Sequence, residues 1–123
     1  MSLLNLSSGR KYFIYNGNLD MRKSFNGITG LIRGELGRDP LSGDVFIFFN
    51  RNRNQTKLLL WEGDGYSIYQ KRLEKGTFEL PDSLDGQPGR PIEWQALQFI
   101  LQGIDLGSIR FRKRYQHPVL KSA

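Results

Sequence analysis

Four groups of Lys and Arg side chains are the residues in this 123-residue chain whose types and spacing best suggest a chemistry. Guanidinium and ammonium groups grip phosphate oxygens, and Asn and Gln amides placed among them can meet the edges of bases. The sequence therefore predicts a surface that contacts nucleic acid. The predicted contact residues are Arg22, Lys23, Arg51, Arg53, Lys57, Lys71, Arg72, Arg110, Arg112, Lys113 and Arg114.

Each group also has a plainer interpretation. Arg22 and Lys23 are expected in the first turn of a helix, where a phosphate would explain two cations that oppose the helix dipole. Asp20 beside them would neutralise the pair equally well. The polar loop from residue 50 to 55 follows a strongly apolar strand, so it can simply keep a sheet soluble. The pair at residues 71 and 72 can be a solvated strand end.

The net charge of +6 is concentrated at one end of the chain. Residues 108 to 123 contain five basic and no acidic side chains, whereas the other 107 residues hold 13 basic and 12 acidic ones. We therefore predict one domain over residues 1–107, followed by a basic tail over residues 108–123 that is attracted to a polyanion. A disordered tail that binds without specificity is the alternative.

The chain offers little for catalysis. It has no cysteine, and its single histidine, His117, lies in the basic tail, so neither a zinc site nor a histidine relay is expected. A metal-dependent nuclease would need Asp20, Glu62 and Asp64 to converge, although turns and helix ends account for these acids more simply. We predict no enzyme activity, no cofactor and no metal. The absence of an export signal and of a long apolar run predicts a cytoplasmic protein without membrane contact.

Three β-rich runs, residues 45–49, 57–61 and 66–69, are joined by short polar turns and predict an antiparallel meander. The first run, VFIFF, is continuously apolar, which is typical of a central strand covered on both faces. Other strands are expected at residues 11–15, at 77–80 and at 108–115, with a loop from 82 to 91.

Apolar residues at helical spacing predict two helices that cover the sheet. The first is expected from about Leu19, capped by Asn18 or Asp20, to Gly37, and the second from Ile92 to Gly103. The fold class is therefore α+β, an antiparallel β-meander of about four to five strands packed against two helices in a single domain.

Several ordered motifs resemble a known family. They are DMRKSFNG at residues 20–27, DPLSG at 39–43 followed by VFIF, then Asn50-Arg51, Lys57, Trp61 and Gly65, and KRLEKG at 71–76 with Phe78 and Pro81. They are similar to the small accessory protein, TnpB or second-reading-frame protein, of bacterial insertion sequences of the IS-sixty-six type, which is unrelated to the RNA-guided nuclease of that label. The resemblance covers residues 10 to 106.

The resemblance implies a transposition accessory factor without catalytic residues, encoded beside a separate transposase. The expected partners are DNA at the transposon ends, the transposase and the other accessory protein of the element. The alternative is a protein–protein adaptor for the transposase, with only weak DNA contact and with Trp61, Tyr66 and Trp94 as anchors.

Overall fold

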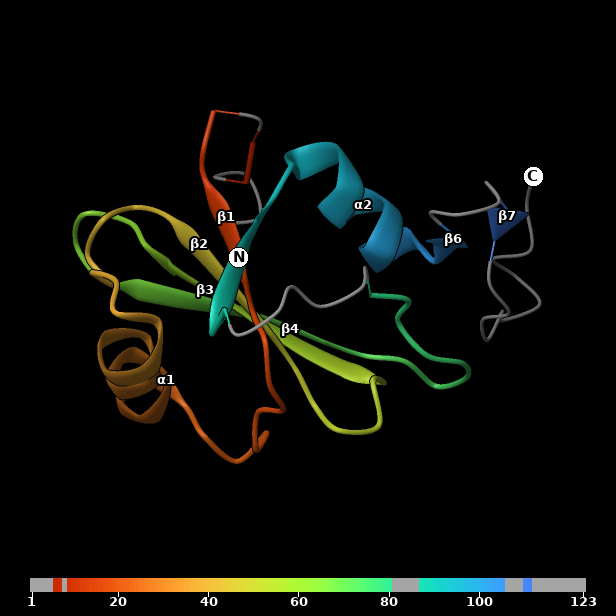
Figure 1. Ribbon diagram of the computed structural model, residues 1–123, viewed down its shortest axis with the longest axis horizontal. Coiled ribbons are helices and arrows are strands. Elements are labelled where there is room, and N and C mark those ends of the chain that lie inside the picture. Colours follow the sequence, from red (N-terminus) through yellow and green to blue (C-terminus); the bar gives the residue numbers. More distant parts are fainter. Residues whose placement is uncertain (1–5, 8, 81–86, 106–109, 112–123) are drawn as a thin grey trace.

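A five-stranded sheet with the order β4-β3-β2-β1-β5 forms the centre of the protein (Figure 1). The structure is a computed structural model that describes residues 6–7, 9–80, 87–105 and 110–111. The strands are β1 Tyr12–Tyr15, β2 Val45–Phe49, β3 Gln55–Trp61, β4 Tyr66–Arg72 and β5 Gly89–Ile92, and a separate short pair is formed by β6 Ile104–Asp105 and β7 Arg110–Phe111.

The predicted meander and the α+β class are confirmed, because β2, β3 and β4 pair antiparallel in sequence order. One pair departs from this pattern: β1 runs parallel to β2, with Tyr12 opposite Val45. A parallel neighbour requires a crossover rather than a tight turn. The first helix supplies that crossover.

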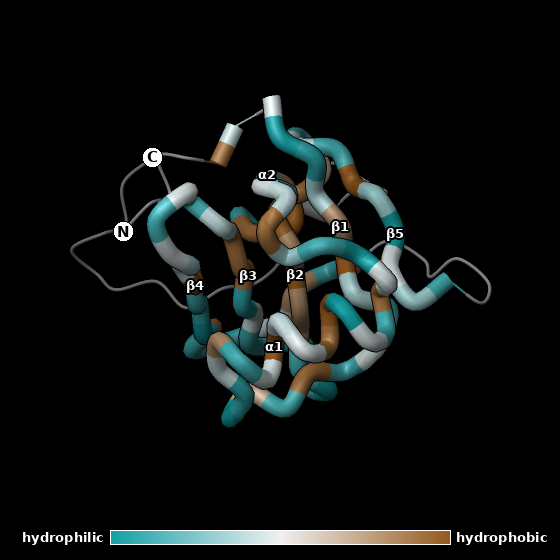
Figure 2. The backbone as a smooth tube through the Cα atoms, turned by 90° about the vertical axis from the view of Figure 1, so that its left-hand side faces the viewer, coloured by the Kyte–Doolittle hydropathy of each residue, from teal (hydrophilic) through white to brown (hydrophobic). Residues whose placement is uncertain are grey.

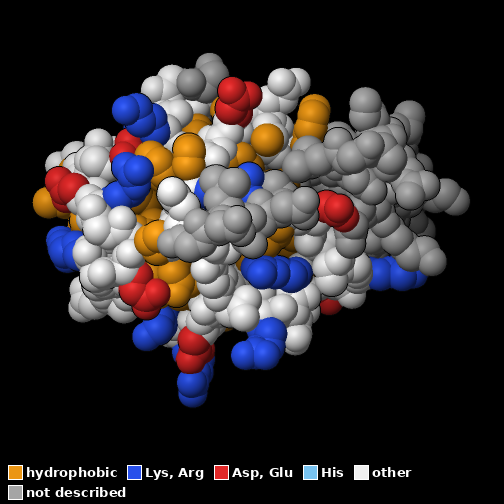
Figure 3. Space-filling model, viewed as in Figure 1, with side chains coloured by type: hydrophobic (Ala, Val, Ile, Leu, Met, Phe, Trp, Pro, Cys, Tyr) orange, Lys and Arg blue, Asp and Glu red, His pale blue; other side chains and the backbone are white. Residues whose placement is uncertain are grey.

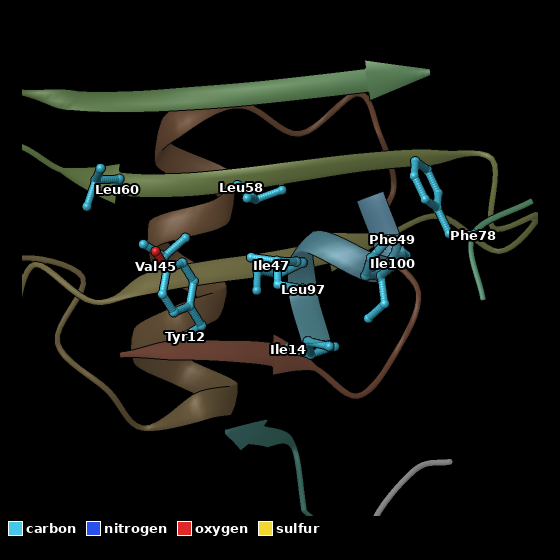
Figure 4. Packing of buried hydrophobic residues seen from close by; sticks show 10 residues of the cluster. All are labelled: Tyr12, Ile14, Val45, Ile47, Phe49, Leu58, Leu60, Phe78, Leu97 and Ile100. Carbon is cyan, nitrogen blue, oxygen red and sulfur yellow. The ribbon is translucent and has the colours of Figure 1, made fainter. Parts of the chain in front are cut away.

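Two helices cover opposite faces of the sheet. Helix α1, Phe25–Leu31, continues into a π-helical turn, η2, Ile32–Leu36, on one face, and α2, Trp94–Gln102, lies on the other (Figures 1 and 4). All five residues of β2 are buried, as predicted for a central strand. Figure 2 shows the brown, hydrophobic positions on the central strands and mostly teal positions in the loops.

Alternate residues of each strand supply the two cores, as the pleat requires. Ile47 faces Leu97 and Ile100 of α2, whereas Phe46 and Phe48 face α1. Burial on both faces explains why β2 shows no alternation in its sequence. The two clusters of buried residues are Tyr12, Ile14, Val45, Ile47, Phe49, Leu58, Leu60, Phe78, Leu97 and Ile100, and Phe13, Leu19, Ile28, Ile32, Phe46, Phe48 and Leu59.

The predicted start of the first helix is wrong. The helix begins at Phe25 after Ser24, rather than at Leu19 behind a cap from Asn18 or Asp20. The backbone N–H of Leu19 donates instead to the Phe49 carbonyl, at 2.8 Å, and ties this segment to the end of β2. Both helix ends are confirmed, since Gly37 and Gly103 are left-handed with φ of 63° and 85°. No helix in the described ranges is long and apolar enough to cross a membrane.

Two predictions near the end of the domain, one of a strand and one of a loop, are also wrong. Residues 77–80 form no strand; Phe78 instead is buried against Phe49, with ring centroids 5.3 Å apart. The predicted loop from 82 to 91 contains the start of β5, where Arg90 pairs with Ile14. Of the strand expected at 108–115, residues 110 and 111 form β7, and the others lie outside the described residues.

Candidate nucleic-acid interface

The loop between β2 and β3 is built around the side chain of Asn50. Its Oδ1 accepts the backbone N–H groups of Asn54 and Gln55, each at 3.0 Å, and its Nδ2 donates to Asn54 Oδ1 at 2.7 Å. Arg53 takes a left-handed conformation, with φ of 57°, and so completes the tight loop. The amides of Asn50 and Asn54 are therefore used to shape the loop, which corrects the expectation that they meet bases.

The same loop is bonded to the segment that follows β4. The Leu73 N–H donates to the Asn54 carbonyl at 2.8 Å, and the Phe78 N–H donates to the Arg53 carbonyl at 2.7 Å. In the β3–β4 ladder, Gln55 lies opposite Arg72. Two of the predicted cationic groups, the loop arginines and the pair at residues 71 and 72, are therefore neighbours at one end of the sheet.

A hollow lies at this end, between the end of β4 and the end of α2. Lys71 Nζ donates to the Leu101 carbonyl at 3.0 Å, so its ammonium is held against the last turn of the helix. Arg72 forms an exposed ion pair with Glu74 at 3.4 Å, and Lys75 is exposed beside them. The lining residues are Lys71, Arg72, Leu73, Glu74, Lys75, Leu101 and Gln102.

We refer to Arg51, Arg53, Lys71, Arg72 and Lys75 as the basic rim. Figure 3 shows Lys and Arg side chains along the lower margin and at the right of one face of the molecule, and also on its left and upper left, with carboxylates among them. Lys75 was not among the predicted contact residues. The KRLEKG motif, which places it three residues after Arg72, was the signal that could have identified it.

Lys57 is predicted as a contact residue, but the structure places its side chain inside the protein. Lys57 is only 6% exposed, and its Nζ donates to the carbonyls of Met21 and Lys23 at 2.8 and 2.6 Å. These carbonyls point at the ammonium group instead of joining a helix. Lys57 therefore holds the segment before α1 in place, and we leave it out of the basic rim.

Arg22 and Lys23 precede α1 rather than occupying its first turn, so the helix-dipole argument for a phosphate does not apply to them. Arg22 bonds to the Asp20 carboxylate through its side chain and its backbone. The Arg22 Nη2 lies 2.6 Å from Asp20 Oδ2, and the Arg22 backbone N–H donates to Asp20 Oδ1 at 3.0 Å. The side-chain hydrogen bond from Arg22, followed by the backbone one, holds the pKa of the Asp20 carboxyl well below its usual range. Of the two explanations, neutralisation by Asp20 accounts for Arg22, whereas Lys23 is exposed.

The tail can be placed only in part. Arg110 belongs to β7, opposite Asp105 of β6, and its strand follows the end of α2 that lines the hollow. Arg112, Lys113, Arg114 and His117 lie outside the described residues.

At the opposite end of the sheet, two cations are already engaged with the protein. Arg10 Nη1 donates to the Gly43 carbonyl at 2.6 Å, and the Arg38 guanidinium lies over the Phe13 ring, 3.6 Å from its centre. Lys11 and Arg33 are exposed near these residues in the sequence. The sheet therefore has exposed cations at both ends, but the bonded loops gather them only at the basic rim.

The three acids considered for a nuclease do not converge. Asp20 adjoins Leu19, which is bonded to the end of β2, whereas Glu62 and Asp64 lie in the β3–β4 turn at the other end of the sheet. The Glu62 carboxylate accepts a hydrogen bond from the Ser67 hydroxyl. Within the described residues, no group of three or more His, Cys, Asp or Glu side chains is arranged to hold a metal ion.

The three aromatic residues considered as anchors are each half-buried. Trp94 stacks on Tyr12 at 5.4 Å and belongs to the core under α2, while Trp61 and Tyr66 pack edge to face at 5.0 Å beside the β3–β4 turn. Only the second pair lies at a margin of the sheet, where a partner can reach it.

Comparisons with known proteins show a family and two relatives that the chain is similar to. The model of the TnpB_IS66 family, described as IS66 Orf2-like protein, matches residues 10–111. Two uncharacterized proteins of Sinorhizobium fredii (strain NBRC 101917 / NGR234) are similar: y4jC is 30% identical over 84 residues, which are 68% of this chain and 72% of the relative. The other, y4hO, is 31% identical over 102 residues, which are 81% of this chain and 87% of the relative. No solved structure matches the chain.

Proposed function

Since this chain belongs to the IS66 Orf2-like family and is therefore a transposition accessory protein, we propose that it works by binding DNA through the basic rim and the basic tail. The rim would grip phosphates of the duplex. Such contacts position a protein on DNA and carry little sequence information themselves. No catalytic step is part of the proposal, so breakage and joining of DNA would belong to the transposase.

The observation that carries the proposal is the pair of backbone hydrogen bonds that join the β2–β3 loop to the segment after β4. They bring side chains about twenty residues apart in sequence to one end of the sheet, where Arg51 and Lys75 are exposed. Glu74 is the carboxylate bonded there, and it pairs with Arg72 alone in the described contacts. An excess of positive charge on one end is the electrostatic pattern of a phosphate-binding surface.

The test is a salt titration of binding to a duplex that carries the element's terminal repeats and to a scrambled duplex. Changing Arg51 and Lys75 together to Ala removes two exposed charges from the rim. If both contact phosphate, the slope of log affinity against log salt falls by about 1.8, because each phosphate contact contributes about 0.9. Changing Arg110, Arg112, Lys113 and Arg114 to Ala tests the tail in the same way.

The matched control is the double change of Lys11 and Arg33 to Ala. It also removes two exposed charges, but from outside the basic rim, since Lys11 precedes β1 and Arg33 lies in η2. The control should keep the wild-type slope. If both double variants lose affinity equally, net charge rather than the rim governs binding, and no binding of the wild type at low salt would reject the DNA proposal altogether.

A contact with the transposase is the second candidate, favoured by the half-buried Trp61–Tyr66 pair at the margin of the sheet. Aromatic side chains in such positions are frequent anchors of protein interfaces. The two candidates differ in salt dependence. Co-purification with the transposase at high salt, lost in the Trp61→Ala variant, would support the adaptor function, whereas retention that disappears with salt would support DNA bridging.

A further inference from the structure

The outer edge of β4 is the longest strand edge that no described strand covers. Strand β4 is outermost in the sheet, spans seven residues, and contains neither Gly nor Pro (Figure 4). The opposite edge, β5, has four residues, and its Pro91 lacks a backbone donor. Long unprotected edges pair readily with a further strand, and natural proteins usually cover or blunt them. An edge of this length that no described strand covers therefore indicates a partner.

The hydrogen-bond pattern shows which residues of β4 face outward. At one end of the hairpin the Glu62 N–H donates to the Gly65 carbonyl, and at the other the Leu73 N–H donates to the Asn54 carbonyl. Bonded and non-bonded pairs alternate along an antiparallel ladder, so odd-numbered residues of β4 bond to β3. The residues whose backbone N–H and C=O groups point away from the sheet are Tyr66, Ile68, Gln70 and Arg72.

Charge along this edge is asymmetric. The stretch from Tyr66 to Gln70 carries no charged side chain; Lys71 and Arg72 stand at its end, and the turn before it holds Asp64. Asp64 is exposed in this turn. If β4 of a second copy paired parallel with this edge, like charges would lie together. If it paired antiparallel, the basic end of each β4 would lie beside the acidic turn of the other copy.

We propose that a second copy of this chain pairs antiparallel with β4 and continues the sheet across a two-fold axis at Ile68. In this register Ile68 meets its own copy, Tyr66 lies opposite Gln70, and Arg72 lies opposite Asp64 of the second copy. The pairs that lie within β4, Ile68 with its copy and Tyr66 with Gln70, join outward-facing residues, as bonded pairs of an antiparallel ladder require. The same patch serves both copies, so the interface is closed and gives a dimer rather than a fibre.

The first test is the mass of the full chain in solution without DNA, measured by light scattering after size exclusion. Wild type should have twice the chain mass of 14.2 kDa. The Gln70→Pro variant should be a folded monomer, because its missing N–H points outward and leaves the ladder with β3 intact. Gln70→Thr keeps the N–H and should stay dimeric. A wild type that is monomeric at about 100 µM, or a dimer that survives Gln70→Pro, would overturn the proposal.

The second test uses the charge pair and does not depend on the proposed DNA contact. Asp64→Lys and Arg72→Asp should each weaken the dimer by about tenfold, and the double variant should recover most of the loss. Asp64 lies outside the basic rim. DNA binding by the Asp64→Lys variant, measured at protein concentrations below the dissociation constant of the dimer, therefore separates the dimer proposal from the DNA-binding proposal. If the losses of the two single variants simply add in the double variant, the proposed register is wrong.

Discussion

Lys57 and the basic rim show two uses of the same kind of side chain. Lys57 is almost fully buried and satisfies two backbone carbonyls, those of Met21 and Lys23. Arg51 and Lys75 of the rim are exposed. One cation fixes the fold of the segment before α1, whereas the others remain available to a ligand. The difference teaches that a basic side chain near a candidate site counts toward binding only when it is not buried inside the protein.

Exchange of Lys57 for Met gives the largest expected effect. Methionine keeps the length of the buried stem but removes both hydrogen bonds, so we expect the free energy of unfolding to fall by about 2–4 kcal/mol, as the loss of charge-assisted hydrogen bonds predicts. Urea unfolding followed by circular dichroism measures it. The salt slope of DNA binding in the folded variant should stay close to wild type.

The control for this change is Lys23→Met, which removes the same charge from a side chain that is exposed. It should alter stability by less than about 0.5 kcal/mol, as is usual for surface positions. If Lys57→Met were as harmless as Lys23→Met, the carbonyls of the preceding segment would not depend on the ammonium group, and the contrast with the basic rim would disappear.

The sequence predicted the regular parts of the fold because their signals are local. The VFIFF run identifies a strand buried on both faces, and Gly37 and Gly103 mark the helix ends, where a left-handed residue is required. Turns of polar residues and glycine fix the meander. These features depend on neighbours in sequence, and the structure contains them where they were predicted.

The parts that sequence reasoning missed depend on distant partners. Met21 and Phe25 have helical spacing, but the contact of Lys57 with the carbonyls before α1 overrides it. Strand β5 reads as a loop because of Gly89 and Pro91, and it becomes a strand by pairing with β1. Burial of one lysine among many likewise has no local signature. Long-range hydrogen bonds therefore decided both the helix start and the membership of the basic rim.

Arg90 provides a third environment for a cation, with an intermediate expected effect. It lies opposite Ile14, and its Nε and Nη1 are buried with no hydrogen-bond partner among the residues that the structure describes. A buried donor without a partner carries a desolvation cost, so Arg90→Met should raise the free energy of unfolding by about 1 kcal/mol. The measurement is again urea unfolding.

Arg90→Ala separates packing from charge, since it removes the apolar stem together with the guanidinium. It should be less stable than Arg90→Met. A clear loss of stability in Arg90→Met itself would mean that the guanidinium is satisfied as Lys57 is, and buried cations in this chain would then form one class rather than two.

The smallest effect is expected from the ion pair that neutralises Arg22. Asp20→Asn retains an oxygen for the Arg22 backbone N–H but removes the charge. The bonded guanidinium lowers the pKa of Asp20 in the folded state, so the pair stabilises the protein above the carboxyl's unfolded pKa, near pH 4, and this contribution is lost as the pH falls below it. Because the Arg22 side chain is 91% exposed, the stabilisation is small and screened by salt.

Wild type should therefore unfold at a slightly higher urea concentration than Asp20→Asn at pH 7. The urea midpoints of the two proteins should approach each other as the pH is lowered from 4 to 2. A difference in urea midpoint that persists at pH 2 would assign the effect to the turn closed by the Asp20 side chain and the Arg22 backbone N–H, instead of to the charge. Arg22 would then remain as available to phosphate as the basic rim.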